Sequence, residues 1–206
     1  PGGAFYPRPS ADNPPPKAAN YPGEPRYSYP ELLDLTKAWL QCDYQTCIHA
    51  IGDGANRMAL DVFEELFADP TVVAPGTGPD LRLRIEHAQI LTETDIPRFA
   101  SLGVIPSMQP THATTDWQTA TERLGEERVR WGYTWRSLLD TGAALVFGSD
   151  FPVEPVSPFI GLHSATSRQN PNGIPEGGWL TDEAVTREEA LRAFTLTAAW
   201  GGFDED

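Results

Sequence analysis

The stretch TCIHAIGDG, residues 46–54, decides how the rest of the chain is interpreted. A short apolar run ends at His49, and a glycine-bracketed Asp53 leads into a segment with helical character. This pattern predicts a β-strand that carries a histidine at its own C-terminal end. In parallel α/β proteins that end bears ligands and chemistry, because the loops there vary while the strands hold their side chains rigidly.

Two later stretches repeat the arrangement. The segment LRLRIEH, residues 81–87, is strand-like and ends in His87, and AALVFGSD, residues 143–150, is strand-like and ends in Asp150. About one and about two βα units separate the three candidates, so three different strands can bring them to one point. Two imidazoles and a carboxylate at strand ends predict a metal site.

Helical periodicity fills the segments between the expected strands. One helix is expected after Ser28 as its cap, a second after Gly54, and a third over residues 92–102 with Gly103 as a left-handed cap. Residues 104–108 are expected to form a further strand, residues 129–140 a helix, and Thr186 to open a last helix in a capping box. Residues 109–122 and 151–178 show no clear period, and we expect two loops there that shape a pocket with Trp117 and Trp179.

The alternation of helices and strands predicts a parallel α/β sheet with helical crossovers. Four strands cannot close a barrel, so the pattern allows a small open sheet or the second half of an eight-stranded barrel. The period of two places Cys47 with His49 on one strand face and turns Arg84 and Glu86 toward the helices, where we expect a satisfied ion pair or contacts to a neighbouring helix. Cys47 is expected to be a small core residue.

Two further polar residues follow the third strand. Gln109 and His112 are candidates for substrate contacts, although an ordinary loop histidine is the alternative for His112. His163, in the expected long loop, is interpreted as an ordinary surface histidine.

Composition limits the partners. The chain of 206 residues has 15 basic and 29 acidic residues, a net charge of −14, which argues against nucleic acid or an anionic membrane surface as a partner. The proline-rich residues 1–28 are expected to be a lead-in loop, and residues 29–206 one domain. Cys42 and Cys47 have no disulfide or zinc-finger spacing, and no leader or apolar run of about 18 residues is visible, so we expect a cytoplasmic protein.

At these residues the chain resembles the metal-dependent amidohydrolase superfamily, and its amidohydrolase-3 branch above all. Three motifs carry the resemblance, IHAIGD at residues 48–53, EHAQ at residues 86–89 and GSDFP at residues 148–152, and the run YTWRSLLD at residues 133–140 fits the same branch. The resemblance covers roughly residues 29–200.

The resemblance implies a specific fold and site. It implies the C-terminal half of a (β/α)₈ TIM barrel, strands five to eight, truncated at both ends. His49 would end the fifth strand, His87 the sixth and Asp150 the eighth. The two histidines and Asp150 would hold a divalent metal of the zinc type, and Asp150 would also be the catalytic base. The implied reaction is hydrolysis of a C–N bond other than a peptide bond in a small amide-like substrate.

The departures from the family limit what this chain does alone. The family's His-x-His on the first strand and its bridging lysine on the fourth have no counterpart here, so we expect a fragment that is inactive by itself. Its oligomeric state is open, a homo-oligomer included. Two alternatives remain, another metal-dependent barrel hydrolase such as a phosphoesterase, and a non-catalytic truncated piece.

Overall fold

The computed structural model of the chain describes residues 25–72 and 80–205. Four parallel strands form one sheet in the order β1-β2-β3-β4, with β1 at Cys47–Ala50, β2 at Arg84–His87, β3 at Ile105–Met108 and β4 at Val146–Phe147. The helices are α1 (Tyr29–Leu40), α2 (Asp53–Ala68), α3 (Ile96–Leu102), α4 (Pro110–Val129), α5 (Trp135–Asp140), α6 (Pro158–Ser167), α7 (Arg187–Phe194) and α8 (Leu196–Gly201), with a 3₁₀ turn, η2, at Thr181–Glu183. The predicted parallel α/β alternation is confirmed.

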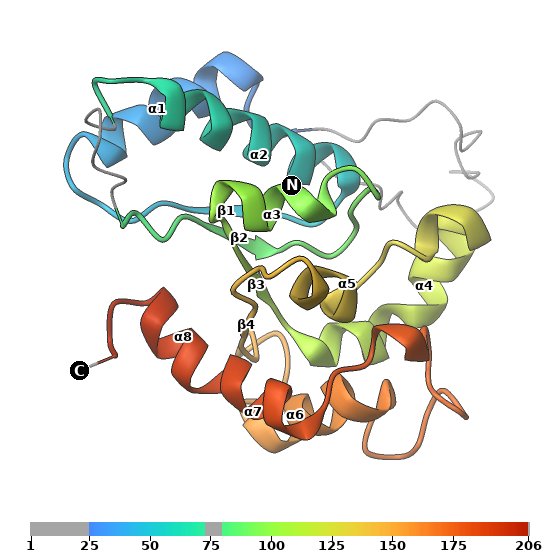
Figure 1. Ribbon diagram of the computed structural model, residues 1–206. Helices are drawn as coiled ribbons and strands as arrows, with labels where there is room; N and C mark the ends of the chain where they lie inside the picture. Colours follow the sequence, from blue (N-terminus) through green and yellow to red (C-terminus); the bar gives the residue numbers. More distant parts are fainter. Residues whose placement is uncertain (1–24, 73–79, 206) are drawn as a thin grey trace.

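The sheet lies between two groups of helices. Helices α1 and α2 lie along one side and α6, α7 and α8 along the other, with the four strands between them (Figure 1). Helix α2 contacts β1, α3 contacts β3, and α7 and α8 contact β4. Most of the predicted lead-in, residues 1–24, lies outside the described residues.

The predicted helix ends are confirmed where the sequence has a capping signal. At α1 the backbone N–H of Ser28 donates to Glu31 Oε2 at 2.8 Å, and at α7 the N–H of Glu189 donates to Thr186 Oγ1 at 3.2 Å. Gly103 ends α3 with φ 67°, a left-handed conformation that glycine adopts without a Cβ clash. These ends follow from local hydrogen bonding, which is why they could be predicted.

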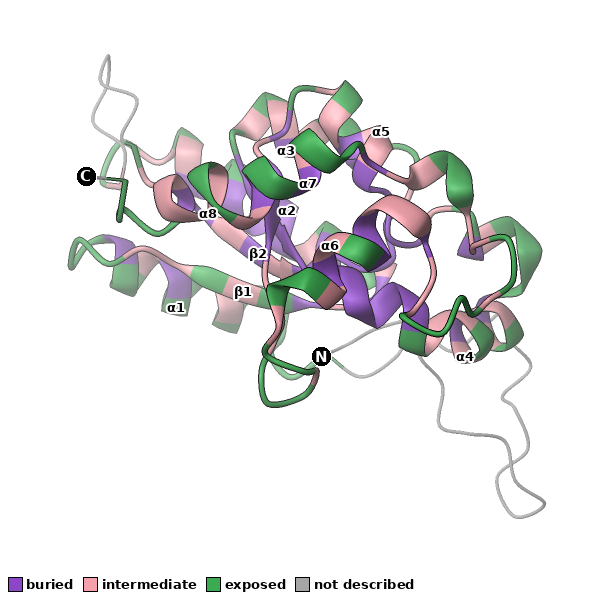
Figure 2. Ribbon diagram, turned by 90° about the horizontal axis from the view of Figure 1, so that it is seen from below, coloured by how far each residue is buried: buried purple, intermediate pink, exposed green. Residues whose placement is uncertain are grey.

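The strand register sets which residues share a face. Cys47 pairs with Arg84 and His49 with Glu86, so these four side chains project from one face, while Ile85 projects from the other into the core. Figure 2 shows the buried residues concentrated in and around the sheet. The expected ion pair is confirmed, with Arg84 Nε 2.8 Å from Glu86 Oε1. It lies on the face of His49, opposite α1 and α2, and Arg84 Nη1 also donates to the carbonyl oxygen of Gly201 in α8 at 3.5 Å.

Cys47 was predicted to be a core residue, and that prediction is wrong. Its side chain is exposed, because no described helix covers this face of the sheet at β1. Further along, α8 covers the same face: a Cβ on Gly201 would lie 3.3 Å from Val146 Cγ2 and 3.6 Å from Ile105 Cδ1. The face is therefore open at β1 and closed at β4.

Two strands are shorter than predicted. Residues 81–83 do not join β2, because Arg82 has φ 42° and interrupts the extended backbone, although Leu83 is still buried. Strand β4 comprises only Val146–Phe147, and residues 148–150 lie beyond it. The apolar pattern thus predicted burial correctly and the length of the hydrogen-bonded strand incorrectly.

Two predicted loops contain helices. Residues 109–122 lie largely in α4, which begins at Pro110 and buries a face that includes His112, Ala113 and Ala120. Residues 151–178 contain α6, whose buried positions Gly161, Ser164 and Ala165 are small and so give a weak apolar pattern. In both segments tertiary packing forms a helix that periodicity does not reveal.

The helix predicted over residues 129–140 begins later. Helix α4 ends at Val129, Gly132 then forms a bridge with Ile90, and Tyr133 takes a left-handed φ of 54° before α5 begins at Trp135. The chain therefore turns between two helices at this point.

Candidate metal centre

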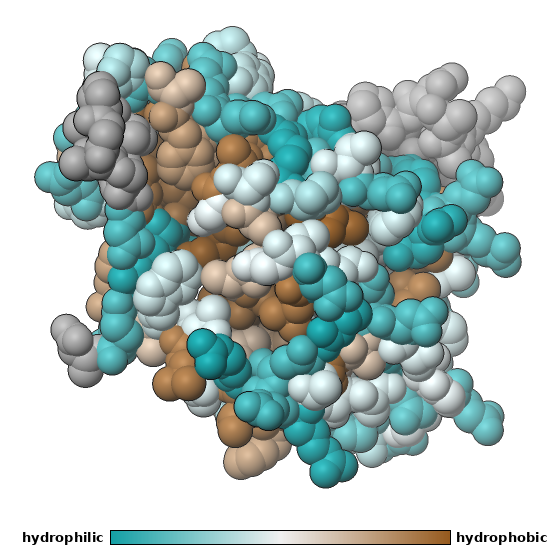
Figure 3. Space-filling model, in the orientation of Figure 1, coloured by the Kyte–Doolittle hydropathy of each residue, from teal (hydrophilic) through white to brown (hydrophobic). Residues whose placement is uncertain are grey.

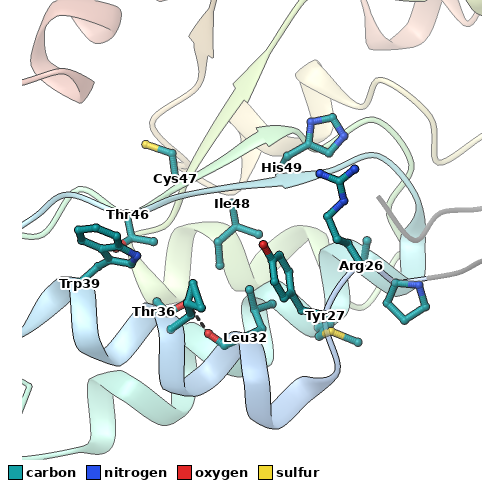
Figure 4. A pocket seen from close by; sticks show the side chains of 13 residues that line it. Arg26, Tyr27, Leu32, Thr36, Trp39, Thr46, Cys47, Ile48 and His49 are labelled. Carbon is teal, nitrogen blue, oxygen red and sulfur yellow. Dashed lines mark hydrogen bonds between the residues drawn. The ribbon is translucent and has the colours of Figure 1, made fainter.

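His49 lies at the C-terminal part of β1 on the open face of the sheet. Figure 4 shows Cys47 and His49 pointing away from α1, whereas Ile48 points toward it, as strand alternation requires. The ring of His49 lies against that of His87, with centroids 4.4 Å apart and an interplanar angle of 74°. The first two predicted ligands therefore come from neighbouring strands.

His87 reaches this position through an unusual backbone. By register it pairs with Ala50, on the face opposite His49, yet its φ is 76° and that of Ala88 is 44°. These left-handed conformations end the regular pleat, so alternation no longer determines where the ring points. Such conformations cost of the order of 1–3 kcal/mol per residue and cluster at functional sites.

Asp150 and His112 complete a compact group with His87. Asp150 lies beyond β4, also with a left-handed φ of 57°, and its Oδ2 is 3.1 Å from Nε2 of His112 in the first turn of α4. One ligand atom each from His87, His112 and Asp150 lies within 4.8 Å of the others. Imidazole nitrogens and carboxylate oxygens are ligands of zinc-type ions, so this donor set fits a divalent cation.

Both histidines of this group have an acceptor on Nδ1. Gln109 Oε1 lies 2.8 Å from Nδ1 of His87, and Glu154 Oε1 lies 3.3 Å from Nδ1 of His112. Gln109 also donates from Nε2 to the carbonyl oxygen of Ser107 at 3.2 Å. The predicted substrate contact Gln109 thus lies in direct contact with His87.

Burial acts on the titration of the strand-end histidines. The His49 residue is exposed overall, but its ring is partly desolvated where it packs against His87. This desolvation is the largest influence on the pKa of His49 and lowers it, and the neighbouring His87 lowers it further. Burial likewise lowers the pKa of His87, against the opposing effect of the Asp150 carboxylate. A lowered pKa favours the neutral imidazole, the form that binds a metal ion.

A buried hydrogen-bond network lies beside the centre. The hydroxyl of Tyr133 donates to Asp116 Oδ2 at 3.0 Å and accepts a hydrogen bond from Nε2 of Gln89. Burial raises the pKa of Tyr133 well above its ordinary value, and Asp116 adds to this. Because Gln89 follows His87 by two residues and Asp116 follows His112 by one helical turn, the network ties the end of β2 to α4.

Of the predicted ligands, His87 and Asp150 come together, and His49 lies beside His87. His112, predicted as a substrate contact, lies within the same group. The metal-binding and substrate-binding roles of these residues stay predictions. His163 lies in α6, with Nε2 3.1 Å from the carbonyl oxygen of Asn170.

Sequence reasoning missed Asp116 and Glu154. Asp116 meets the hydroxyl of Tyr133 from α4, a segment that was not predicted to be helical. Glu154 reaches His112 because the chain after Asp150 turns back toward α4. The spacing of four residues between His112 and Asp116 would have pointed to a shared helix face, had a helix been predicted. No local signal identifies Glu154.

A groove of ≈ 510 Å³ opens between α1 and β1 and includes His49 in its lining. Tyr27, Leu32, Trp39 and Ile48 give it a largely apolar wall (Figure 4). On the face seen in Figure 3, apolar side chains are visible over the middle of the molecule and also at its lower left edge, among hydrophilic ones. In residues 25–72 and 80–205 no helix is long and apolar enough to cross a membrane.

Comparisons with known proteins show what the chain is similar to. Residues 7–206 match the model of a family described as amidohydrolase family. The chain is 37% identical over 174 residues to Protein LONG AFTER FAR-RED 3 of Arabidopsis thaliana, covering 84% of this chain and 28% of that protein. It is 30% identical over 155 residues to the putative amidohydrolase YtcJ of Bacillus subtilis strain 168, covering 75% of this chain and 28% of that one. It is also 30% identical over 195 residues to an N-substituted formamide deformylase of Arthrobacter pascens, covering 94% and 34%.

Two solved structures of metal-dependent hydrolases also match the chain. An uncharacterized metal-dependent hydrolase from Pyrococcus horikoshii OT3 matches 91% of this chain with a TM-score of 0.77 and 32% identity, over 35% of its own length. A second, from Pyrococcus furiosus, matches 96% of this chain with a TM-score of 0.74 and 30% identity, over 36% of its length. The chain therefore spans roughly a third of the length of these relatives, or less.

Proposed function

The chain belongs to the amidohydrolase family, and from this premise we propose that it carries part of the active site of a metal-dependent hydrolase that cleaves C–N bonds other than peptide bonds. The observation that carries the proposal is the convergence of His87, His112 and Asp150 at the C-terminal edge of a parallel sheet. That edge is where parallel α/β enzymes place their chemistry.

We propose further that the four strands are strands five to eight of a (β/α)₈ barrel. Parallel strands with helical crossovers, and the likeness to hydrolases about three times as long, support this architecture. The outer edge of β1 has no strand partner among the described residues, and its exposed face carries His49 and Cys47. In a closed barrel the preceding strand would pair with this edge.

In this proposal His49, His87 and Asp150 hold a divalent ion, with zinc as the first candidate. Such an ion, when bound, lowers the pKa of a water molecule and polarises a scissile carbonyl. With the ion bound, the Asp150 carboxylate would accept a proton from the attacking water and deliver it to the leaving nitrogen. Gln109 and His112 orient the substrate, and Gln109 also holds the His87 ring through Nδ1. Nε2 of His112 lies in the same donor group as His87 and Asp150, so in this proposal it also faces the bound ion.

The proposed substrate is a small amide-like molecule. The name of the Arthrobacter relative, an N-substituted formamide deformylase, supports this class. The surroundings of the centre are acidic, since Asp150, Glu154 and Glu86 all lie close to its histidines. An acidic site disfavours an anionic phosphoester. We propose the cytoplasm as the location, because both cysteines, Cys42 and Cys47, are free.

Amide hydrolysis by the full-length gene product tests the proposal. Release of 4-nitroaniline from 4-nitroformanilide, and of amines from a panel of N-alkylformamides, is measured before and after chelation and after zinc is restored. We expect turnover that chelation abolishes and zinc restores, and that Asp150→Asn removes. Turnover that survives complete metal removal, or none for any amide in a zinc-loaded, folded protein, would refute it.

A further inference from the structure

We infer that Glu154 is a positioning residue for His112: its carboxylate holds Nδ1 of the imidazole and thereby directs Nε2 toward Asp150 and the proposed metal centre. The inference rests on the proposed function for the meaning of that centre. It assigns a role to a residue that belongs to none of the sequence motifs.

The first support is the geometry of the imidazole. His112 lies between two carboxylates, with Glu154 Oε1 3.3 Å from Nδ1 and Asp150 Oδ2 3.1 Å from Nε2. A neutral imidazole has one N–H and can donate it to only one of these oxygens. The tautomer of His112 is therefore determined by which carboxylate takes the hydrogen bond.

The second support is how Glu154 is held. Its side chain is 12% exposed and that of His112 is 9% exposed, so both lie in a largely dry environment. The hydroxyl of Thr115 donates to Glu154 Oε1 at 2.8 Å, which anchors the carboxylate from α4 itself. Thr115 and His112 lie three residues apart on that helix, so the anchor and the ring it serves move together.

The third support is the absence of another partner. Among residues 25–72 and 80–205, no lysine or arginine forms an ion pair with Glu154. A carboxylate kept for an ordinary structural ion pair would have one, whereas the contacts of Glu154 are to an imidazole and a hydroxyl. Its negative charge is therefore available to take the Nδ1 hydrogen of His112.

The Nδ1 hydrogen bond with Glu154 leaves a lone pair on Nε2. Nε2 lies 3.1 Å from Oδ2 of Asp150. Two hydrogen-bond acceptors at this distance repel each other unless a cation or a proton lies between them. A carboxylate behind a histidine that faces a metal ion is a general way to fix tautomer and ring orientation. Gln109 behind His87 repeats the arrangement with a neutral acceptor.

The test uses the full-length gene product with ¹⁵N-labelled histidine and zinc. Solid-state ¹⁵N spectra report the His112 tautomer, with its signals assigned by their loss in His112→Gln. Zinc affinity is measured by competition with a chromophoric chelator. We expect the Nδ1–H form in the wild type, and in Glu154→Gln a mixed or Nε2–H form with zinc binding weakened about 10- to 100-fold.

Matched controls separate positioning from general destabilisation. Glu189→Gln alters a glutamate that pairs with Arg136 and caps α7, so it should lower the melting temperature and leave the His112 signals unchanged. Thr115→Val removes the anchoring hydroxyl and should change the His112 tautomer and the zinc affinity in the same direction, but less. If Glu154→Gln does not fold, Thr115→Val is measured in its place. Glu154→Asp should restore part of the zinc affinity.

Unchanged His112 signals and unchanged zinc affinity in folded Glu154→Gln, or in folded Thr115→Val where Glu154→Gln does not fold, would overturn the inference. An Nε2–H tautomer in the wild type would also overturn it. If Glu154→Gln shifts the tautomer while the zinc-loaded wild type hydrolyses no amide, the role of Glu154 stands and the proposed function fails.

Discussion

The two edges of the sheet differ in how well this chain covers them. At β4 the ring of Phe147 packs against Trp135 of α5 and Phe194 of α7, each with centroids 5.4 Å apart. At β1 the side chains of Cys47 and His49 are exposed. Side chains near the β4 edge, such as His112, are oriented by contacts within the chain, whereas His49 is placed mainly by its strand.

This difference shows which part of the site the chain determines by itself. His87, His112 and Asp150 have hydrogen-bond partners that restrict their rings and carboxylates. On the β1 side, Leu35, Trp39 and Tyr44 are 45–60% exposed, which leaves apolar surface beside His49. A patch of this kind is a candidate contact surface, and the effect of Leu35→Ala on stability shows whether another part of the protein covers it. The following predictions test the contrast, and all use the full-length gene product.

The largest effect is expected on the β4 side, at Asp150. Asp150→Asn keeps the shape of the side chain and removes its basicity, so we expect kcat to fall about 10²- to 10⁴-fold. Steady-state kinetics with 4-nitroformanilide measures this. Asp140→Asn, at an exposed carboxylate of α5, is the control and should retain wild-type kcat. A kcat within threefold of wild type for Asp150→Asn would remove Asp150 from the reaction.

Burial predicts the next largest effect. Ile85 of β2 is fully buried, so Ile85→Ala should lower the free energy of unfolding by about 2–5 kcal/mol. Leu35→Ala, at 45% exposure beside β1, should change it by less than about 0.5 kcal/mol if that side faces solvent. Urea denaturation measures both. A loss of about 2 kcal/mol or more for Leu35→Ala would show that another part of the protein covers the β1 side.

The network at Tyr133 predicts a smaller effect. Tyr133→Phe removes a buried hydroxyl and leaves the side chains of Gln89 and Asp116 without that partner, at a cost of about 1–3 kcal/mol in the free energy of unfolding. Tyr44→Phe, at 60% exposure, should be neutral. Equal denaturation midpoints for the two variants would contradict the proposed tie between β2 and α4.

The smallest effect concerns pH. The hydrogen bond with Arg136 is the main cause that lowers the pKa of Glu189 from 4.5 to about 2. A carboxylate with a lowered pKa stabilises the folded state fully above pH 4.5, and this stabilisation is lost as the pH falls toward 2. The side chain of Glu189 is 34% exposed, so we expect less than about 1 kcal/mol.

Melting temperatures between pH 6 and pH 2.5 measure the effect at Glu189. In Glu189→Gln the melting temperature should fall slightly less steeply between pH 4.5 and pH 2.5 than in the wild type. The two melting temperatures should therefore approach each other at the acid end of the range. Glu188→Gln, at an exposed neighbour, should leave the profile unchanged. An identical profile for wild type and Glu189→Gln would show that the pair contributes no pH-dependent stability.

The strand ends could be predicted from sequence because an apolar run followed by a polar residue is a local signal. That signal located His49, His87 and Asp150 at one edge of a parallel sheet. Helix α4 could not be predicted from its polar composition, since the residues that it buries include His112 and Thr114. Because no helix was predicted there, the sequence did not show that Asp116 lies one helical turn after His112.

Two other features depend on the fold as a whole. The left-handed backbone at His87 overrides strand alternation. Histidine adopts positive φ more often than most residues, but that preference is too weak to predict the conformation at one position, which the surroundings must stabilise. Glu154 reaches His112 only through the path of the chain after Asp150. Local patterns predict strands and caps well, while contacts between distant segments require the folded structure.

The most direct test of the central claim is metal content per chain by elemental analysis. The full-length gene product and its His49→Ala/His87→Ala variant are compared, with circular dichroism to confirm the fold. We predict at least one equivalent of zinc in the wild type and its loss in a folded double variant. A folded wild type without any divalent metal, or a variant that retains its zinc, would contradict the claim that these strand ends form a metal centre.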